Sequence, residues 1–480
     1  MKVSKDQLQA VLSQFNPWWR NELIADLPQW HRSAFGELLS WLTAPPAPRA
    51  ILLAGARQIG KTTLMLQAIE ALLKSGVAPA NILYATFDHP ILKLAGLDAV
   101  IDAWRAREPK VAGTEYLLLD EAQFIRDWGT WIKHQVDFQK ERRIAFTGSA
   151  SPLAAAEQES GVGRWHTLQL STLSFYEYLQ LTNLALPPLP AVSSLRELFD
   201  WPVSAFTRAT ELAKPYIGHF HEFLLRGGFP QTAQVDSITQ AQRLLREDII
   251  DKVLKRDMTA LFGVRRVLDL EHTFIYLCMH DGGLLDMVNL CTNLAVKRPT
   301  AQNFIELLDA THLIYRLPPY GYGKDILRAR FKIYLADAAI APAVMLKGKA
   351  LLDDPAALGQ AVETAVFKHL FARDYHENVR FSYWRGKQDR EVDWIAEVNG
   401  QVIPFELKYR RQHTSLSDLK GLLELCQHKA ITHGYVITQS LDDLGPITER
   451  HTTTRFMRIP AVLLCYWLSE SERTRAQPLY

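Results

Sequence analysis

The residues with the clearest chemistry lie in the segment Ile51–Leu64, which reads ILLAGARQIGKTTL. Gly55 is followed after four residues by Gly60, Lys61 and Thr62, the spacing of a phosphate-binding loop. An apolar run enters the loop and a run with helical spacing leaves it. Glycines in that context fold the chain around an anion, so that backbone N–H groups and a helix N-terminus point at it. We therefore predict that ATP is held by Gly55, Gln58, Ile59, Gly60, Lys61, Thr62 and Thr63.

A phosphate-binding loop needs a carboxylate partner, and the run EYLLLD followed by Glu121 supplies one. Lys61 would reach the β and γ phosphates, while Thr62 and Asp120 would hold Mg²⁺. Glu121, the next residue, would orient and deprotonate the attacking water. The alternative is a strand that merely ends in two acids at a turn.

Three further polar residues follow later in the segment. Thr147 and Ser149 close another apolar run and would read the γ-phosphate or hold the water, although a plain turn is the alternative. Arg164 is a candidate for the arginine that neutralises transition-state charge, in cis or across a subunit boundary. Its alternative role is that of a solvated loop arginine.

These residues need a sheet to position them. Continuous apolar runs at Ala50–Leu53, Asn81–Asp88, Glu115–Asp120 and Arg143–Thr147 alternate with helical stretches. This pattern predicts an α/β fold with a parallel sheet covered on both faces, whose ligands bind at the carboxyl ends of the strands. Residues 1–45 are expected to form two or three short helices, whose tryptophans pin them to a neighbour.

The order of several motifs resembles a large group of prokaryotic AAA-type P-loop ATPases. These motifs are the phosphate loop, Asp120-Glu121-Ala122-Gln123, Thr147-Gly148-Ser149, Gly163-Arg164, Leu173-Ser174-Phe175-x-Glu177, Arg226-Gly227-Gly228-Phe229-Pro230 and Lys332-Ile333-Tyr334-x-x-Asp337. In that group the C-terminal part is a domain of unknown function that resembles restriction endonucleases. The resemblance and the residue patterns together give five expected regions: a helical segment (1–45), the AAA-type ATPase domain (46–180), a helical lid (181–270), a winged-helix-like module (271–345) and an endonuclease-like α/β domain (346–480).

The C-terminal region carries a second set of residues with possible chemistry. Asp393 in one expected strand and Glu406 and Lys408 in the next resemble the core of the restriction-endonuclease fold. Glu406 and Lys408 are two residues apart and so share one face of their strand. Together with Glu363, the two acids would form an all-oxygen Mg²⁺ site, and Lys408 would activate water or stabilise charge. An exposed strand face with alternating charges is the alternative, and whether the domain cleaves is left open.

Residues 271–345 have a helix, helix, hairpin layout, with Pro299-Thr300 where a recognition helix would start. From Asp286 to Lys332 there are seven Lys and Arg against four Asp and Glu. This local excess suits contact with DNA phosphates, but winged helices also pack against protein.

Composition sets the outer limits. A chain of 480 residues exceeds one hydrophobic core, and 48% hydrophobic with 22% charged residues is typical of soluble globular proteins. The net charge of +2 gives no global attraction to nucleic acid, so any such contact must be local. The four cysteines lack metal-ligand spacing, and no apolar run approaches membrane-spanning length. We therefore expect a cytoplasmic protein that does not enter a membrane.

The sequence thus predicts an ATP-hydrolysing, DNA-acting ATPase that uses ATP and Mg²⁺ and assembles into a homo-oligomer. Two alternatives remain: an ATP-switched signalling or scaffold protein whose C-terminal domain docks protein, and a motor that remodels branched DNA without nuclease activity. Nuclease activity, the DNA structure recognised, the subunit number and the site of action of Arg164 are not fixed by the sequence.

Overall fold

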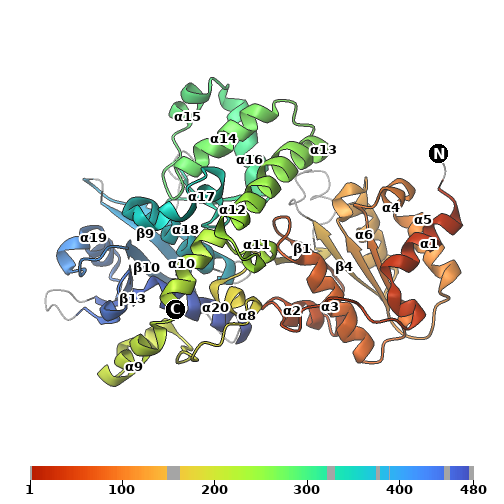
Figure 1. Ribbon diagram of the computed structural model, residues 1–480, viewed down its shortest axis with the longest axis horizontal. Helices are drawn as coiled ribbons and strands as arrows, with labels where there is room; N and C mark the ends of the chain where they lie inside the picture. The colour runs from red at the N-terminus through yellow and green to blue at the C-terminus, as the bar shows by residue number, and fades with distance from the viewer. Residues whose placement is uncertain are drawn as a thin grey trace. The chain divides into compact units, whose positions relative to one another are not determined.

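Figure 1 shows the computed structural model, which describes residues 3–148, 163–321, 330–374, 379–388, 390–447 and 454–474. The chain divides into two compact units. The first unit comprises Met1–Leu170 and Ala310–His312, and the second comprises Ser171–Asp309 and Leu313–Tyr480. Each unit contains its own large sheet, and no described helix is long and apolar enough to span a membrane.

The sheet of the first unit has five parallel strands in the order β2-β3-β4-β1-β5. The strands are β1 (Ala50–Ala54), β2 (Ile82–Thr86), β3 (Glu115–Asp120), β4 (Arg142–Gly148) and β5 (Trp165–Gln169). The four strands predicted from apolar runs are confirmed as a parallel sheet, whereas β5 was not predicted. Because β4 lies between β1 and β3, a side chain at the end of β3 reaches the phosphate loop past the end of β4.

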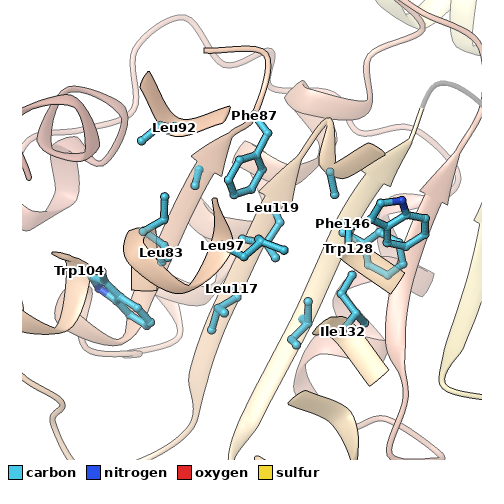
Figure 2. Close-up of a cluster of buried hydrophobic side chains, with 14 of the residues drawn as sticks. Leu83, Phe87, Leu92, Leu97, Trp104, Leu117, Leu119, Trp128, Ile132 and Phe146 are labelled. Atoms are coloured by element: carbon cyan, nitrogen blue, oxygen red, sulfur yellow. The ribbon is translucent and has the colours of Figure 1, made fainter. Parts of the chain in front are cut away.

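Helices and the apolar faces of the strands form the core of this unit. The helices are α1 (Lys5–Phe15), α2 (Phe35–Thr43), α3 (Lys61–Lys74), α4 (Pro90–Ala95), α5 (Leu97–Arg107) and α6 (Trp128–Phe138). Figure 2 shows Leu83, Leu117 and Leu119 of the sheet among Leu97, Trp104 and Ile132 of the helices, all fully buried or nearly so. Burial on this scale fixes the strand ends from which the polar residues project.

The N-terminal helices are fastened to the edge strand β2. Trp18 and Trp19, in or beside the short 3₁₀ helix Pro17–Arg20, both donate through Nε1 to the carbonyl of Ile82, at 3.2 and 3.0 Å. Asn16 accepts a hydrogen bond from the Tyr84 N–H and donates one to the Tyr84 carbonyl, at 2.7 and 2.8 Å. These contacts confirm that the aromatic N-terminal segment pins a helix to its neighbour, and they cover an edge that would otherwise expose unpaired backbone groups.

The second unit begins with a run of helices, and it includes the described residues of the predicted lid (181–270). These helices are α8 (Phe175–Leu181), α9 (Val203–Ala213), α10 (Tyr216–Arg226), α11 (Pro230–Gln234), α12 (Ile238–Arg246), a π-helix (Glu247–Asp257) and α13 (Met258–Phe262).

Three helices and a two-stranded antiparallel sheet follow. They are α14 (Val267–Met279), α15 (Met287–Leu294), α16 (Arg298–Ala310), β6 (Ile314–Leu317) and β7 (Lys332–Leu335). An isolated antiparallel bridge between Leu284 and Lys332 adds a short third segment between α14 and α15. We call residues 267–335 the α14–β7 module.

The remaining chain forms a six-stranded sheet in the order β12-β13-β11-β10-β9-β8. Its main elements are α17 (Ile340–Val344), α18 (Pro355–Asp374), β8 (Arg380–Arg385), β9 (Glu391–Val398), β10 (Gln401–Lys408), α19 (Lys420–Lys429), β11 (His433–Thr438), β12 (Gly445–Pro446), β13 (Arg455–Pro460) and α20 (Ala461–Thr474). Strand β9 is antiparallel to both of its neighbours, β8 and β10, while β11 is parallel to both β10 and β13.

Candidate active site

The phosphate-binding loop connects β1 to α3 in a conformation that requires its glycines. Gly55 has φ +149°, and a Cβ placed there would lie 2.3 Å from the carbonyl oxygen of Leu170. Gly60 has φ +95° and caps α3 without a side-chain hydrogen bond. Because glycine has no side chain to cap the helix, the first N–H groups of α3 stay available to bind an anion.

Lys61 lies inside the loop with only 5% of its surface exposed. Its Nζ donates to the carbonyl oxygens of Gly55 and Ala56 at 2.8 and 2.7 Å. These are neutral acceptors, and a phosphate oxygen makes a stronger, charge-assisted bond to an ammonium group. The position of Lys61 is therefore suited to binding the phosphates of a nucleotide.

Asp120, at the carboxyl end of β3, is the centre of a hydrogen-bond network. Its Oδ2 accepts from the Thr62 hydroxyl at 2.7 Å and from the Tyr84 hydroxyl at 2.9 Å, and its Oδ1 accepts from the Thr147 hydroxyl at 2.5 Å. Burial, and then the charge of Asp120, raises the pKa of Tyr84 well above its usual value, so this hydroxyl stays a donor. Thr62 and Asp120 thus bring two oxygens side by side at the loop, which fits the ligands Mg²⁺ takes in nucleotide sites.

Glu121 directly follows Asp120 and has an unusual left-handed backbone conformation, with φ 55°. Its N–H donates to the Thr147 hydroxyl at 2.8 Å, and Gln123 Nε2 donates to its carboxylate. A left-handed glutamate held from both ends is a constrained side chain, which is common at functional sites. Thr147 therefore positions Asp120 and Glu121 in this structure, a role more specific than the plain turn.

The predicted ATP site also included Ser149 and Arg164. Ser149 lies outside the described residues. Arg164 precedes β5, which pairs in parallel with β1 so that Trp165 lies opposite Ala50 and Gln169 opposite Ala54. The phosphate loop follows Ala54, so about 16 Å of strand separates it from Arg164.

Arg164 is instead bound at its own end of the sheet. Its Nε lies 2.6 Å from the carboxylate of Asp137. A role for Arg164 in cis does not fit this geometry, because strand direction puts the residue at the wrong edge. Action in trans stays a prediction.

Sequence reasoning missed two contacts to the loop region. Arg32, from the N-terminal segment, donates through Nη1 to the carbonyl of Ile59 at 2.9 Å. His312, from the short 310–312 piece of the first unit, has Nδ1 2.9 Å from Nε2 of Gln169. Burial, and then the charge of Lys61, lowers the pKa of His312 to about 3, so the ring is neutral. Neither contact has a local sequence signal, because the partners are far apart in the chain.

The four predicted residues of the C-terminal region do come together. Glu363 lies on α18, Asp393 on β9, and Glu406 and Lys408 on β10. Lys408 Nζ donates to Glu406 Oε1 at 2.5 Å, which confirms that both residues project from one strand face. Asp393 Oδ2 accepts the N–H of the intervening Leu407 at 2.9 Å, so β9 and β10 are joined at this point.

The same place holds a residue that the sequence analysis did not connect with it. Lys332, at the start of β7, lies 3.3 Å from Asp393 Oδ1 and 3.9 Å from Glu363 Oε1, and it also contacts the Glu391 carboxylate. Among the described residues, no group of three or more His, Cys, Asp or Glu is arranged to hold a metal ion. We call Lys332, Glu363, Glu391, Asp393, Glu406 and Lys408 the acidic centre.

The carboxyl groups of the acidic centre repel one another. Burial, and then the charge of Asp393, raises the pKa of both Glu363 and Glu406. Two arginines close in sequence to the acidic centre form ion pairs, Arg390 with Glu424 and Arg410 with Asp418, each at 2.6 Å. These pairs favour a structural role for both arginines.

In the α14–β7 module, one face of α16 is polar. Arg298, Gln302, Asn303 and Glu306 are exposed, whereas Ala301, Phe304, Ile305 and Leu308 are buried. Next to this face is a cavity of about 480 Å³ whose lining includes Arg298, Gln302, Glu306, Arg316 and Arg330. Two of these arginines are paired with acids: Arg316 with Asp309 at 2.6 Å, and Arg330 with Asp286 at 3.1 Å.

Comparison with known families accounts for three parts of the chain. Residues 47–179 match an AAA domain, residues 217–351 match a domain of unknown function (DUF8612), and residues 358–459 match another (DUF4143). An uncharacterized protein of Haemophilus influenzae is 25% identical over 370 residues, which are 75% of this chain and 82% of that protein. An uncharacterized protein of Methanocaldococcus jannaschii is 28% identical over 371 residues, 74% of each chain.

Solved structures are more distant. Aquifex aeolicus DnaA bound to AMPPCP is 15% identical, with 60% of this chain and 90% of that chain covered and a TM-score of 0.24. A DNA polymerase III gamma subunit-related protein of Thermotoga maritima is 13% identical, with coverages of 58% and 97% and a TM-score of 0.26. Such TM-scores support no argument from these structures. The match of residues 47–179 and the loop geometry together show that the chain contains an AAA-type P-loop ATPase domain, followed by two domains of unknown function.

Proposed function

We propose that the first unit hydrolyses ATP with Lys61, Thr62, Asp120 and Glu121, and that the protein uses this turnover to act on DNA through α16. The observation that supports the hydrolytic part best is the chain of hydrogen bonds from Thr62 through Asp120 and Thr147 to Glu121. It links the residue that follows the phosphate loop to the residue placed to accept a proton.

Each residue of this chain has a physical task. Lys61 and the N–H groups at the start of α3 bind and orient the phosphates. Mg²⁺, held by the oxygens of Thr62 and Asp120, supplies positive charge that offsets the charge developing on the transferred phosphoryl group. The Glu121 carboxylate orients the attacking water and accepts its proton, while Thr147 fixes the Glu121 backbone and Gln123 holds the carboxylate.

The proposed action on DNA is supported by the shape and chemistry of the α14–β7 module. Three helices followed by a two-stranded hairpin are the layout in which a helix presents its exposed face to a DNA groove. On α16 that face offers Arg298, Gln302 and Asn303, side chains that hydrogen-bond to base edges and phosphates. Glu306, together with the acids Asp309 and Asp286 that pair with the two arginines, reduces the positive charge here. We therefore expect modest affinity and a salt slope that reflects only a few phosphate contacts.

One set of measurements tests both parts of the proposal. ATP turnover is measured alone and with single-stranded, duplex and branched DNA, and DNA retention is measured over a range of salt concentrations. We expect one DNA form to stimulate turnover, and we expect Arg298→Ala to reduce the salt slope of binding by about 1. Arg208→Ala, on the exposed face of α9, is the matched control and should leave the slope unchanged.

Different failures of this experiment have different meanings. ATP turnover without any salt-dependent DNA retention would refute the action on DNA and favour the alternative of an ATP-switched scaffold. A wild-type protein that does not turn over ATP under any of these conditions would refute the hydrolytic part instead. Phosphodiester cleavage by Glu363, Asp393, Glu406 and Lys408 is not part of the proposed function.

A further inference from the structure

The acidic centre already contains a cation of its own. The Lys332 side chain is 5% exposed, and its ammonium group lies among carboxylates from two elements: Glu363 of α18, and Glu391 and Asp393 of β9. Burial alone would lower the pKa of Lys332, but the charges of these carboxylates raise it above the usual value. The Lys332 ammonium group thus contacts three carboxyl groups of the acidic centre.

Four of the six carboxylate oxygens of Glu363, Asp393 and Glu406 accept from protein donors. Asp393 uses one oxygen for Lys332 and the other for the Leu407 N–H. Glu363 Oε1 accepts the Tyr334 hydroxyl at 2.7 Å, and Glu406 Oε1 accepts from Lys408. Among the described residues only Glu406 Oε2 is a buried oxygen of this group without a partner, so a divalent ion would have to displace protein donors from most of the other oxygens.

We propose that the Lys332 ammonium is the resident cation of the acidic centre, so that this centre binds no divalent metal and does not cleave phosphodiesters. A divalent ion placed among these carboxylates would lie within a few ångströms of the ammonium and be repelled by it. The predicted Mg²⁺ site of Glu363, Asp393 and Glu406 therefore does not fit the residues around it. This inference is independent of the proposed ATPase function, because every residue of the acidic centre lies in the second unit.

The position of Lys332 also gives the acidic centre a task. Lys332 belongs to β7 of the α14–β7 module, and Tyr334 of the same strand donates to Glu363 and accepts from Trp394 Nε1 at 3.1 Å. Tyr383 of β8 donates to the Arg330 carbonyl at 2.7 Å and pairs with the segment after β6. The acidic centre is thus the charged part of a joint that fixes the α14–β7 module to the C-terminal sheet.

The first test counts metal sites. Mn²⁺ binding to the nucleotide-free full chain is measured by electron paramagnetic resonance for the wild type and for Glu363→Gln, which share the same ATP site. We expect both proteins to bind the same number of Mn²⁺ ions with the same affinity. A site that is present in the wild type and lost in Glu363→Gln would overturn the proposal.

A second measurement uses the wild type alone and so does not depend on the folding of a variant. Amide hydrogen exchange of peptides from α18 and β9 is compared in chelator and in Mn²⁺, and circular DNA is incubated with the same protein and ion. We expect unchanged exchange in these peptides and uncut DNA. Slower exchange in Mn²⁺ at α18 and β9, or Mn²⁺-dependent cleavage of the circular DNA, would overturn the proposal.

Discussion

Replacing Glu121 by Gln is the sharpest test of the ATP site. Gln has nearly the volume of Glu and the same backbone preferences, so the φ of 55° and the hydrogen bond from the Glu121 N–H to Thr147 are retained. What the variant loses is the carboxylate that accepts a proton from water. General-base assistance contributes about 10²–10⁴-fold, so kcat should fall by that factor, equivalent to about 3–5 kcal/mol in the barrier. The Kd for ATP should not change, because no predicted phosphate ligand is altered.

The assay combines equilibrium binding of ATP with single-turnover release of phosphate, each with and without the DNA form that stimulates best. Glu141→Gln is the matched control: this glutamate is exposed, forms a 2.6 Å surface pair with Lys110, and should leave kcat unchanged. A Glu121→Gln protein that binds ATP normally and loses less than about tenfold in kcat, or about 1.4 kcal/mol, would refute the role of Glu121 as the base.

Three further changes should affect other parts of the molecule. Gly55→Ala should weaken ATP binding more than about tenfold, because its Cβ would lie 2.3 Å from the Leu170 carbonyl oxygen and the strained φ costs about 1 kcal/mol or more. Titration with a fluorescent nucleotide measures the affinity, and an unchanged affinity would contradict the loop geometry. Lys332→Met should destabilise the second unit by about 3 kcal/mol. This is the lower end of the cost of breaking a buried ion pair, because the facing carboxylates keep 19–30% exposure. Hydrogen exchange of β7 and β9 measures the loss, and full stability would contradict the proposed joint. Burial, and then the charge of Lys368, lowers the pKa of His369 to about 3, and His369 Nε2 accepts the Phe175 N–H, so folding disfavours its protonation. Stability of the second unit should therefore be complete above the ordinary histidine pKa and fall by up to about 1.4 kcal/mol per pH unit as pH drops from about 6.5 towards 3. His369→Leu should be less stable at pH 7 but should lose less on acidification, and an equal loss would refute the assignment.

The sequence predicted the parts of the ATP site whose signals are local. Gly55 and Gly60 mark the loop because no other residue adopts their backbone angles without strain, and the run before Asp120 marks a strand because it is apolar throughout. Thr147 was found as a candidate, but its task was not, because only strand order shows that β4 lies between Asp120 and the loop. Likewise, only strand direction shows that Arg164 is at the far end of β5.

The acidic centre shows a different limit of sequence reasoning. Alternation on β10 correctly placed Glu406 and Lys408 on one face, but it did not show that this face is buried at Glu406, which is 6% exposed. The controlling residue, Lys332, comes from a strand 61 residues before Asp393. A carboxylate pattern in sequence indicates that a cation is needed, but it does not say whether the cation is a metal or a distant lysine.

Two of the buried lysines, Lys61 and Lys332, make that distinction physical. Lys61 Nζ donates to two carbonyl oxygens, which are neutral and release an ammonium group readily to an incoming phosphate. Lys332 contacts carboxylates, and separating these buried charges costs several kcal/mol. A ligand ion therefore does not readily displace the Lys332 ammonium group. Ligand exchange is therefore favoured at Lys61 and opposed at Lys332. For this reason we assign the chemistry of the protein to the first unit, and to the acidic centre the task of holding the α14–β7 module on its sheet.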